Sequence, residues 1–347
     1  MEETRKMPKS LYAMSPNELL GALQLEKGFQ GKQIYSWLMK GVTSFDEMSN
    51  LPKSLRERLT KSMGTPLSSK IAEVQEDGSD AIKLAIELHD TLVVEAVILS
   101  DGKGRMTACL SSQVGCAMGC AFCRTGTMGL QRNLSAFEIV EQFIHIRSIA
   151  PETSHIVFMG MGEPLANREQ VLKAIEHLHN KEGADISYRR ITISTCGLIP
   201  GILALAELNL PVRLAVSLTS ADNNQRNVLM PINRRYPLDD LKRALLHYQH
   251  IINKRFTLEY VMLSNENMSE YHAKKLAQFV RNLEVIVNLI PYNSASELSF
   301  VRPGKREISQ FTRYLDDLGV PYTRRLSKGD TINGACGQLA VKREPLS

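Results

Sequence analysis

The feature that most constrains the fold is a regular alternation of short apolar segments and amphipathic segments that begins near residue 106. The apolar segments predict strands at 106–111, 154–159, 190–195, 212–218, 255–263 and 285–290, with a last short one at 321–326. Amphipathic helices are expected between them, at 135–149, 167–179, 201–208, 238–252, 269–282 and 305–318. Six successive strand–helix units with right-handed crossovers predict an α/β fold, a partial parallel (β/α)6 barrel.

The N-terminal part of the chain has a different pattern. Residues 1–75 contain three apolar-periodic stretches separated by polar turns, and they are expected to form a small helical accessory domain. Two strand-like runs follow, joined by the polar pair His89-Asp90, and predict a β-hairpin connector over 76–104. The barrel then occupies residues 105–347 as the core domain.

Charge and hydropathy bear on location and partners. The formal net charge is +5, and hydrophobic residues make up 43% of the 347 residues, which is the composition of a globular protein. No secretion signal and no long uncharged apolar run is present, so a cytoplasmic protein without a membrane segment is expected. The positive excess lies in short pairs, at 189–190, 234–235, 274–275, 324–325 and 342–343. Such pairs can neutralise phosphates, but this charge is also that of an ordinary solvated surface.

Polar and unusual residues follow the predicted strands at their carboxyl ends. In parallel βα barrels, catalytic residues collect in the loops after these ends. A segment with several cysteines, 115–126, follows the first predicted strand, and Gly160-Met-Gly-Glu163 follows the second. Candidates at the ends of later strands are Ser194, Ser217, Leu218, Thr219 and Asn293. The sequence therefore predicts one site at the carboxyl edge of the barrel.

Three cysteines lie close together as Cys116-x3-Cys120-x2-Cys123, in a segment that contains glycines. A loop of this kind can direct three thiolates at one metal centre, whereas a disulfide framework is unusual in a cytosolic chain of this size. A structural zinc site or an electron-transfer cluster would use a fourth protein ligand, for which Cys109 is available. A 4Fe-4S cluster with three protein ligands leaves one iron open to a small molecule. The spacing alone is compatible with both interpretations.

The cysteine spacing after the first strand of a βα barrel resembles the signature of the radical S-adenosylmethionine superfamily. Phe122 matches an aromatic residue common before the last cysteine, and Gly160-Met-Gly-Glu163 is similar to the superfamily's GGE-type motif. Taken alone, that motif would indicate a tight turn after a strand. The resemblance implies one 4Fe-4S cluster per chain on Cys116, Cys120 and Cys123, with S-adenosylmethionine bound to the open iron.

Sequence strings around the other cysteines narrow the resemblance. Residues 107–116 (TACLSSQVGC), 158–165 (FMGMGEPL) and 334–339 (GACGQL) resemble the RlmN/Cfr family of RNA adenosine methyltransferases, and especially its RlmN branch. Residues 33–37 (QIYSW) and 51–56 (LPKSLR) are similar to segments of the same family. The resemblance therefore covers nearly the whole chain.

The resemblance implies a mechanism with two cysteines that do not bind the cluster. Two S-adenosylmethionine molecules are consumed per turnover: the first methylates Cys336, and the second yields a deoxyadenosyl radical that takes a hydrogen from this methyl group. The methylene radical adds to an adenine carbon that ordinary methyl transfer cannot reach. Cys109 then attacks the sulfur of Cys336 and releases the base by forming a disulfide. Glu95 is implied as the base that removes the ring proton.

The resemblance also implies which residues contact S-adenosylmethionine. These are short polar or backbone groups on strand ends, namely Gly162, Glu163, Ser194, Ser217, Leu218, Thr219 and Asn293. Two positions depart from the family. Thr219 replaces a common histidine, and Arg124 places a positive charge directly after the last cysteine, where it would raise the cluster potential.

The remaining candidates have an ordinary structural interpretation beside the functional one. A buried cysteine is usually a packing residue, which applies to Cys109 and Cys336 when each is taken alone. Glu95 in a strand would by position be a solvated residue. Their roles therefore rest on the resemblance, whereas Cys196 matches no cysteine of the family and is expected to pack beside the cofactor pocket.

The resemblance implies RNA as the substrate. RlmN-like enzymes methylate C2 of an adenine in the peptidyl-transferase loop of 23S rRNA and, in some tRNAs, of the adenine beside the anticodon. The helical domain and the basic pairs are then expected to bind phosphates, while the target base is splayed into the barrel mouth. A cellular electron donor such as flavodoxin and a thiol reductant are the other implied partners.

Two other functions are open at the level of sequence. A Cfr-like enzyme uses the same cysteines to methylate C8 of the adenine, although Pro164 and Pro291 look more like the RlmN branch. A non-enzymatic RNA-binding module would use the three clustered cysteines as a zinc anchor. The methylated product and the bound metal distinguish these hypotheses.

Overall fold

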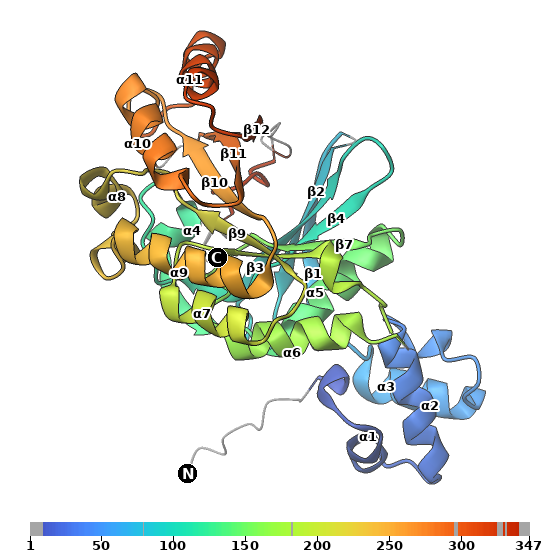
Figure 1. Cartoon of the computed structure of the whole chain (residues 1–347). Coiled ribbons are helices and arrows are strands. Elements are labelled where there is room, and N and C mark those ends of the chain that lie inside the picture. The colour runs from blue at the N-terminus through green and yellow to red at the C-terminus, as the bar shows by residue number, and fades with distance from the viewer. Residues whose placement is uncertain are drawn as a thin grey trace, which may run out of the picture.

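The computed structural model describes residues 10–78, 80–181, 183–294, 298–324, 329 and 332–339. Within these residues, ten strands form one sheet in the order β1-β2-β3-β4-β7-β8-β9-β10-β11-β12, with helices packed outside the barrel strands (Figure 1). The strands are β1 (Lys70–Asp77), β2 (Ala81–Glu87), β3 (Val93–Ser100), β4 (Met106–Cys109), β7 (His155–Phe158), β8 (Ile191–Thr195), β9 (Arg213–Ser217), β10 (Phe256–Met262), β11 (Val285–Pro291) and β12 (Tyr322–Arg324).

From β4 to β12 all neighbouring strands are parallel. The helices that alternate with them are α5 (Ala136–Ile149), α6 (Arg168–His179), α7 (Ile199–Glu207), α9 (Leu238–Ile252), α10 (Glu270–Val280) and α11 (Lys305–Asp317). The sheet is an open series from β1 to β12 among the described strands, so the predicted α/β fold with a partial parallel barrel is confirmed. The last predicted strand adds a further parallel strand, and its residues 325 and 326 lie outside the described residues.

Local signals place most of these elements. α9 buries apolar residues that recur every three or four positions, at Leu238, Leu241, Leu245, Tyr248 and Ile252. A capping box of Ser135 and Glu138 begins α5. Asn167 precedes α6 but makes no capping hydrogen bond through its side chain, whose nitrogen donates to the carbonyls of Ser112 and Leu134, each at 2.8 Å. Asn167 thereby fixes the chain that leaves β4.

The N-terminal helices α1 (Pro16–Ala22), α2 (Gly28–Met39) and α3 (Lys53–Met63) form a cluster beside the barrel (Figure 1). β1 follows them and pairs antiparallel with β2, so the expected boundary at residue 75 falls inside a strand. We propose the same three-part division with its first boundary at 64–69 and a three-stranded connector. None of the described helices is long and apolar enough to span a membrane.

One buried carboxylate ties both ends of the N-terminal helical cluster to the barrel. Glu141 on α5 accepts the Ser10 hydroxyl at 2.5 Å and the backbone N–H and hydroxyl groups of Ser68 and Ser69 at 2.5 to 3.1 Å. Ser69 also contacts His145 Nε2 at 3.0 Å. Burial lowers the pKa of His145, although the Glu141 charge opposes this shift. Because Ser10 precedes α1 and Ser68 follows α3, a single side chain fixes where the cluster enters and leaves the barrel.

We expect Glu141→Gln to loosen this attachment and leave the barrel folded. The amide presents an N–H group where the carboxylate accepts hydrogen bonds, so at least one buried donor loses its partner, at a cost of about 1 to 3 kcal/mol. Limited proteolysis within 64–69 and hydrogen exchange in α1 to α3 should both become faster, while exchange in α9 is unchanged. The exposed Glu152→Gln is the matched control. Identical proteolysis of both variants would contradict this role.

Candidate active site

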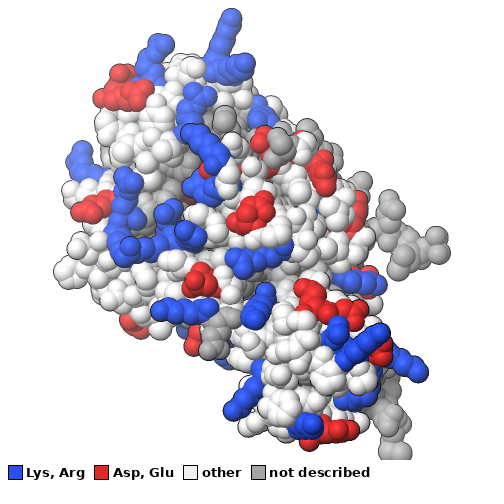
Figure 2. Space-filling model, turned by 90° about the vertical axis from the view of Figure 1, so that its right-hand side faces the viewer, with Lys and Arg blue, Asp and Glu red and all other residues white. Residues whose placement is uncertain are grey.

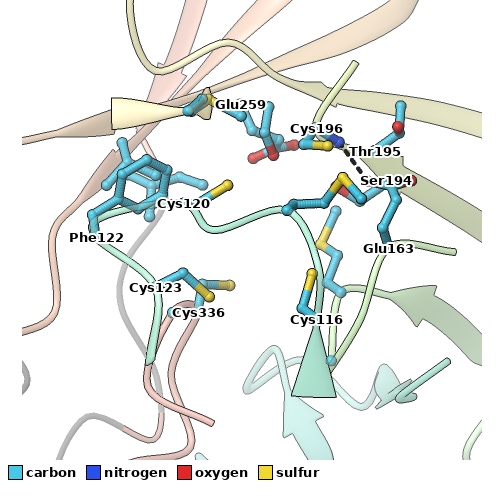
Figure 3. Close-up of a pocket in the computed structure, with 18 of the residues that line it drawn as sticks. Cys116, Cys120, Phe122, Cys123, Glu163, Ser194, Thr195, Cys196, Glu259 and Cys336 are labelled. Carbon is cyan, nitrogen blue, oxygen red and sulfur yellow. Dashed lines mark hydrogen bonds between the residues drawn. The ribbon is translucent and has the colours of Figure 1, made fainter. Parts of the chain in front are cut away.

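The three predicted cluster ligands lie on one tight loop that follows β4. Three elements that the periodicity does not predict build this loop: β5 (Gln113–Cys116), β6 (Gly129–Asn133) and α4 (Arg124–Thr127). Gly115 has a φ of +76°, and a Cβ there would lie 1.9 Å from a backbone oxygen of β6, so glycine is required for the two strands to close. Cys116 ends β5, and the loop returns Cys120 and Cys123 toward it (Figure 3).

The thiols of Cys116, Cys120 and Cys123 line one cavity of about 160 Å³ together with Cys336 (Figure 3). Burial raises the pKa of the three loop thiols, that of Cys116 to about 12, and neighbouring thiols add to the rise. Three thiolates therefore coexist here when a cation offsets their charge. Within the described residues, no three His, Cys, Asp or Glu side chains converge as they would around a single metal ion. The donor set, three thiols of one loop that line one cavity, fits a metal centre with three thiolate ligands.

Gly160, Gly162 and Glu163 form a second wall of the cavity that the cysteine thiols line, here called the thiol cavity. Gly162 has a φ of +99°, and a Cβ there would lie 2.5 Å from Cβ of Gln113. The buried Glu163 carboxylate accepts the backbone N–H groups of Leu165 at 3.0 Å and Cys196 at 2.8 Å. Burial raises the pKa of Glu163, and the hydrogen bonds from Cys196 oppose the rise. Its carboxylate is thus held rigidly at the cavity wall, where it can accept hydrogen bonds from an amino group.

The other predicted cofactor contacts divide between two cavities. Ser194 and Ser217 line the thiol cavity with Gly162 and Glu163, whereas Asn293 lines a larger neighbouring cavity. Leu218 and Thr219 are buried behind these walls and line neither cavity. The placement therefore brings four of the seven predicted contacts directly to the thiols.

Two features of this region fit a bound polar ligand. Thr219 Oγ1 and Asn293 Oδ1 are buried, and neither has a hydrogen-bond partner among the described residues. Buried polar atoms normally have a partner, and for Asn293, which lines the larger cavity, a ligand can supply it. Thr219 also has a φ of +54°, a conformation that β-branched residues rarely adopt and that is concentrated at functional sites. The residues present are those that S-adenosylmethionine, with its ribose, adenine and methionine groups, would satisfy.

The larger cavity, of about 930 Å³, brings together two of the three cysteines outside the cysteine loop. Cys109 lines it from the end of β4, and Cys336 lines it from the C-terminal loop. Cys336, Met159, Glu259 and Ile290 line both cavities, so the thiol cavity and the larger cavity meet at Cys336. Glu259 was not predicted from the sequence, although an acidic residue within the mostly apolar β10 was a usable signal.

Glu95 lies on β3, on the same face of the sheet as Cys109. Val97 is paired with Cys109 in the register, and Glu95 is two residues further along. Glu95 is buried, and its Oε1 is 3.1 Å from Nζ of the buried Lys83. Glu95 therefore does not take the solvated position that is ordinary for an acidic strand residue, and its implied role as the base stays a prediction. Among the described residues that line the two cavities, Glu95 does not appear.

Arg124 connects the cysteine loop to the loop that carries Cys336. Its backbone N–H donates to the Gly337 carbonyl at 2.9 Å, and its Nη1 donates to the Gln338 carbonyl at 3.1 Å. The Thr125 hydroxyl donates to a third carbonyl of the same loop at 2.6 Å. The Arg124 side chain, whose charge was expected to raise the cluster potential, therefore points toward the loop that carries Cys336.

We expect Arg124→Ala to loosen the Cys336 loop. A hydrogen bond from a charged group contributes about 1.5 kcal/mol, so amide exchange over 332–339 should become about tenfold faster. Arg306→Ala, an exposed substitution on α11, is the control. Iron content should be equal in both variants. Unchanged amide exchange over 332–339 in Arg124→Ala would show that the Arg124 side chain does not hold this loop in place.

Known proteins match the chain over nearly its whole length. The radical SAM superfamily matches residues 110–277, and the ribosomal RNA large subunit methyltransferase N-terminal domain matches residues 20–64. The "Probable dual-specificity RNA methyltransferase RlmN" of Treponema pallidum (strain Nichols) is 43% identical, over 95% of this chain and 97% of that relative. The relative of the same name from Carboxydothermus hydrogenoformans is 43% identical, over 91% and 93%. A crystal structure of a radical SAM methyltransferase from Sphaerobacter thermophilus superposes with a TM-score of 0.88 at 38% identity, covering 96% of this chain and 100% of that one.

A three-cysteine loop at the carboxyl edge of a partial parallel barrel, with these matches, defines a radical S-adenosylmethionine enzyme. The cofactors of this class are a 4Fe-4S cluster and S-adenosylmethionine. The near full-length similarity is more specific, and the chain belongs to the RlmN family of RNA methyltransferases. The family predicted from the motifs is therefore confirmed.

Proposed function

We propose that the chain methylates C2 of an adenine in RNA, in 23S rRNA and in some tRNAs, through Cys336. The observation that carries this proposal is the position of Cys336, where the thiol cavity meets the larger cavity lined by Cys109. A sulfur there faces both the proposed cofactor compartment and a space large enough for a nucleotide base. The names of the relatives, dual-specificity RNA methyltransferases, support RNA as the substrate. The cytoplasm is the proposed location.

The proposed cofactor site uses groups from several strand ends. Cys116, Cys120 and Cys123 hold the cluster. When bound, the cluster and S-adenosylmethionine supply a methyl group and a carbon radical. Gly162 permits close approach of the backbone, and Glu163 accepts an amino group. Ser194, Ser217, Leu218, Thr219 and Asn293 offer hydroxyl, backbone and amide groups for the remaining polar edges.

The cysteine pair carries and releases the carbon in this proposal. Cys336 holds the methyl carbon that becomes bonded to the base, and Glu95 accepts the ring proton. The Cys109 thiolate then attacks the Cys336 sulfur: an S–S bond forms, the S–C bond breaks, and its electron pair stays with the carbon, which takes a proton. A cellular thiol reductant restores both thiols, and a donor such as flavodoxin supplies electrons to the cluster. The Lys83 ammonium lies 3.1 Å from Glu95 Oε1, so the two side chains form a buried ion pair.

Basic side chains surround the mouth of the larger cavity. Those that line it are Lys103, Arg105, Arg190, Arg213 and Arg324. His155 lies among them, and its pKa is lowered by burial and by the charges of three of these arginines. Figure 2 shows lysine and arginine side chains gathered around a hollow on this face. Such a mouth would hold the phosphates beside a base that enters toward Cys109, with the N-terminal helical cluster binding RNA further out.

We expect the Arg190→Ala and Arg213→Ala double variant to bind RNA more weakly and with a flatter salt dependence. Each lost contact to a single-stranded phosphate removes about 0.7 from the slope of log K against log salt. The exposed Arg243→Ala on α9 is the control. The same measurement on lysine and arginine variants within 27–62 tests the N-terminal helical cluster. Equal affinity and slope in all variants would contradict the proposed surface.

The decisive experiment identifies the product and the metal together. Anaerobically prepared protein is incubated with 23S rRNA and tRNA transcripts, and the nucleosides are compared by mass spectrometry with C2- and C8-methyladenosine standards. C2-methyladenosine and bound iron are the expected result. C8-methyladenosine would assign the Cfr-like reaction instead. A colourless protein that binds zinc and leaves RNA unmodified would be a binding module.

A further inference from the structure

Arg226 is a buried cation that the reaction outlined above does not use. It lies on α8 (Asn223–Leu229) and is fully buried, with 0% of its surface exposed. Its guanidinium donates to four neutral oxygens at 2.9 to 3.1 Å, the carbonyls of Cys196, Ser217 and Leu218 and the side chain of Asn233. Among the described residues, no carboxylate lies within ion-pair distance of it.

A buried charge of this kind is costly without a counter-charge. Removing an ion from water costs several kcal/mol even after the surroundings relax, and neutral acceptors offset this in part. Burial lowers the pKa of Arg226 to about 10, so the side chain is still positively charged near neutral pH. A negative charge near Arg226, beyond the four neutral oxygens that it contacts, would therefore stabilise this buried cation.

The proposed cluster ligands are the nearest source of negative charge. Arg226 reaches the wall of the thiol cavity through Cys196, whose carbonyl accepts its Nη2 at 2.9 Å and which lines the cavity together with Cys120. The backbone joins the same two regions, since the N–H of Ala121 donates to the carbonyl of Leu229, at the end of α8, at 2.9 Å. Figure 3 shows Cys120 and Cys196 at the wall of the thiol cavity.

We infer that Arg226 is the buried counter-charge of the cluster and acts as a positioning residue for the cofactor site. The inference rests on the proposed ligation by Cys116, Cys120 and Cys123. A 4Fe-4S cluster on three thiolates is net negative and gains a further negative charge when it accepts an electron. A fixed cation nearby stabilises the reduced form more than the oxidised form, so it raises the reduction potential.

The same side chain positions the walls of the cofactor site. Its bonds to the carbonyls of Cys196 and Ser217 join the carboxyl ends of β8 and β9. Gly197 keeps this contact open, because a Cβ there would lie 3.3 Å from Nη2 of Arg226. A purely structural role would depend on these bonds, whereas the counter-charge role depends on the positive charge itself.

The test measures the reduction potential of the reconstituted holoprotein. Arg226→Met and Arg226→Gln remove the charge, Arg226→Lys retains it, and the exposed Arg234→Met is the control for loss of an arginine nearby. Potentiometric titration is followed by the electron paramagnetic resonance signal of the reduced cluster. At the wild-type midpoint, the ratio of reduced to oxidised cluster should fall about tenfold in the neutral variants, which is 59 mV for a one-electron couple. It should stay within about twofold in R226K and R234M.

The outcomes separate this inference from the proposed function. A neutral variant with full iron content and the wild-type ratio overturns the inference. If the neutral variants lose the cluster while R226K retains it, the charge requirement is supported; if R226K loses it equally, the role is structural and the inference is overturned. A wild-type protein that assembles no 4Fe-4S cluster contradicts the proposed function instead.

Discussion

Replacing Cys336 by alanine is expected to abolish RNA methylation and leave the iron content unchanged. Cys336 lies outside the cysteine loop, so its removal takes away the proposed carbon carrier without removing a cluster ligand. Loss of a residue that forms a covalent intermediate lowers turnover by roughly 10³-fold or more. Methylated nucleosides are counted by mass spectrometry, and iron is measured on the same samples.

The wild-type protein provides an independent test of the same role. Protein purified from cells that contain S-adenosylmethionine should carry one added methyl group on the peptide that contains Cys336. In Cys109→Ala the same peptide should still carry the carbon, as the methyl group or as part of a nucleotide adduct, since Cys109 acts after the carbon is bonded to the base; the variant is the matched control. A Cys336→Ala variant that methylates RNA, or a wild-type peptide that never carries the methyl group, would refute the assignment.

Local periodicity predicts the barrel well because each strand and helix carries its own signal. Most of the parallel strands, β7 to β11, are short segments that contain Val, Ile or Leu, and the helices repeat apolar residues at helical spacing. β1 breaks this rule, because it is an edge strand with mostly exposed or half-buried residues and three acidic side chains, so its sequence resembles a polar loop. β5 and β6 carry glycine and cysteine in place of β-branched residues, and their pairing follows from the loop they close.

In the candidate site as well, contacts within one segment are predicted from the sequence, whereas contacts between segments far apart in the sequence are not. The spacing of Cys116, Cys120 and Cys123 predicts their convergence, since eight residues of one loop contain all three. The meeting of Cys109 with Cys336 depends on how the C-terminal loop docks on the barrel, which residue spacing does not contain. The ion pair of Lys83 with Glu95 likewise joins different strands, so residue spacing does not predict it. Arg226 was missed because its burial arises from α8 folding onto two strand ends.

Replacing Cys109 by alanine is expected to stop the reaction after the base is attached and to accumulate a covalent complex of protein and RNA. Without the Cys109 sulfur, nothing in the proposed mechanism attacks Cys336, so its S–C bond to the base stays intact. The complex should survive denaturing electrophoresis and disappear on ribonuclease treatment, leaving a nucleotide mass on the Cys336 peptide. Free methylated RNA should fall by roughly 10³-fold.

Trapping in Cys109→Ala also tests where the base binds, because of the position of Cys109. Cys109 and Cys336 line the same cavity, so a trapped base occupies the space between β4 and the C-terminal loop. Cys109→Ala with Cys336→Ala should form no complex, because the attachment point is gone. A complex in that double variant would place the RNA attachment elsewhere. Full turnover by Cys109→Ala alone would show that another thiol, from the chain or from solution, releases the base.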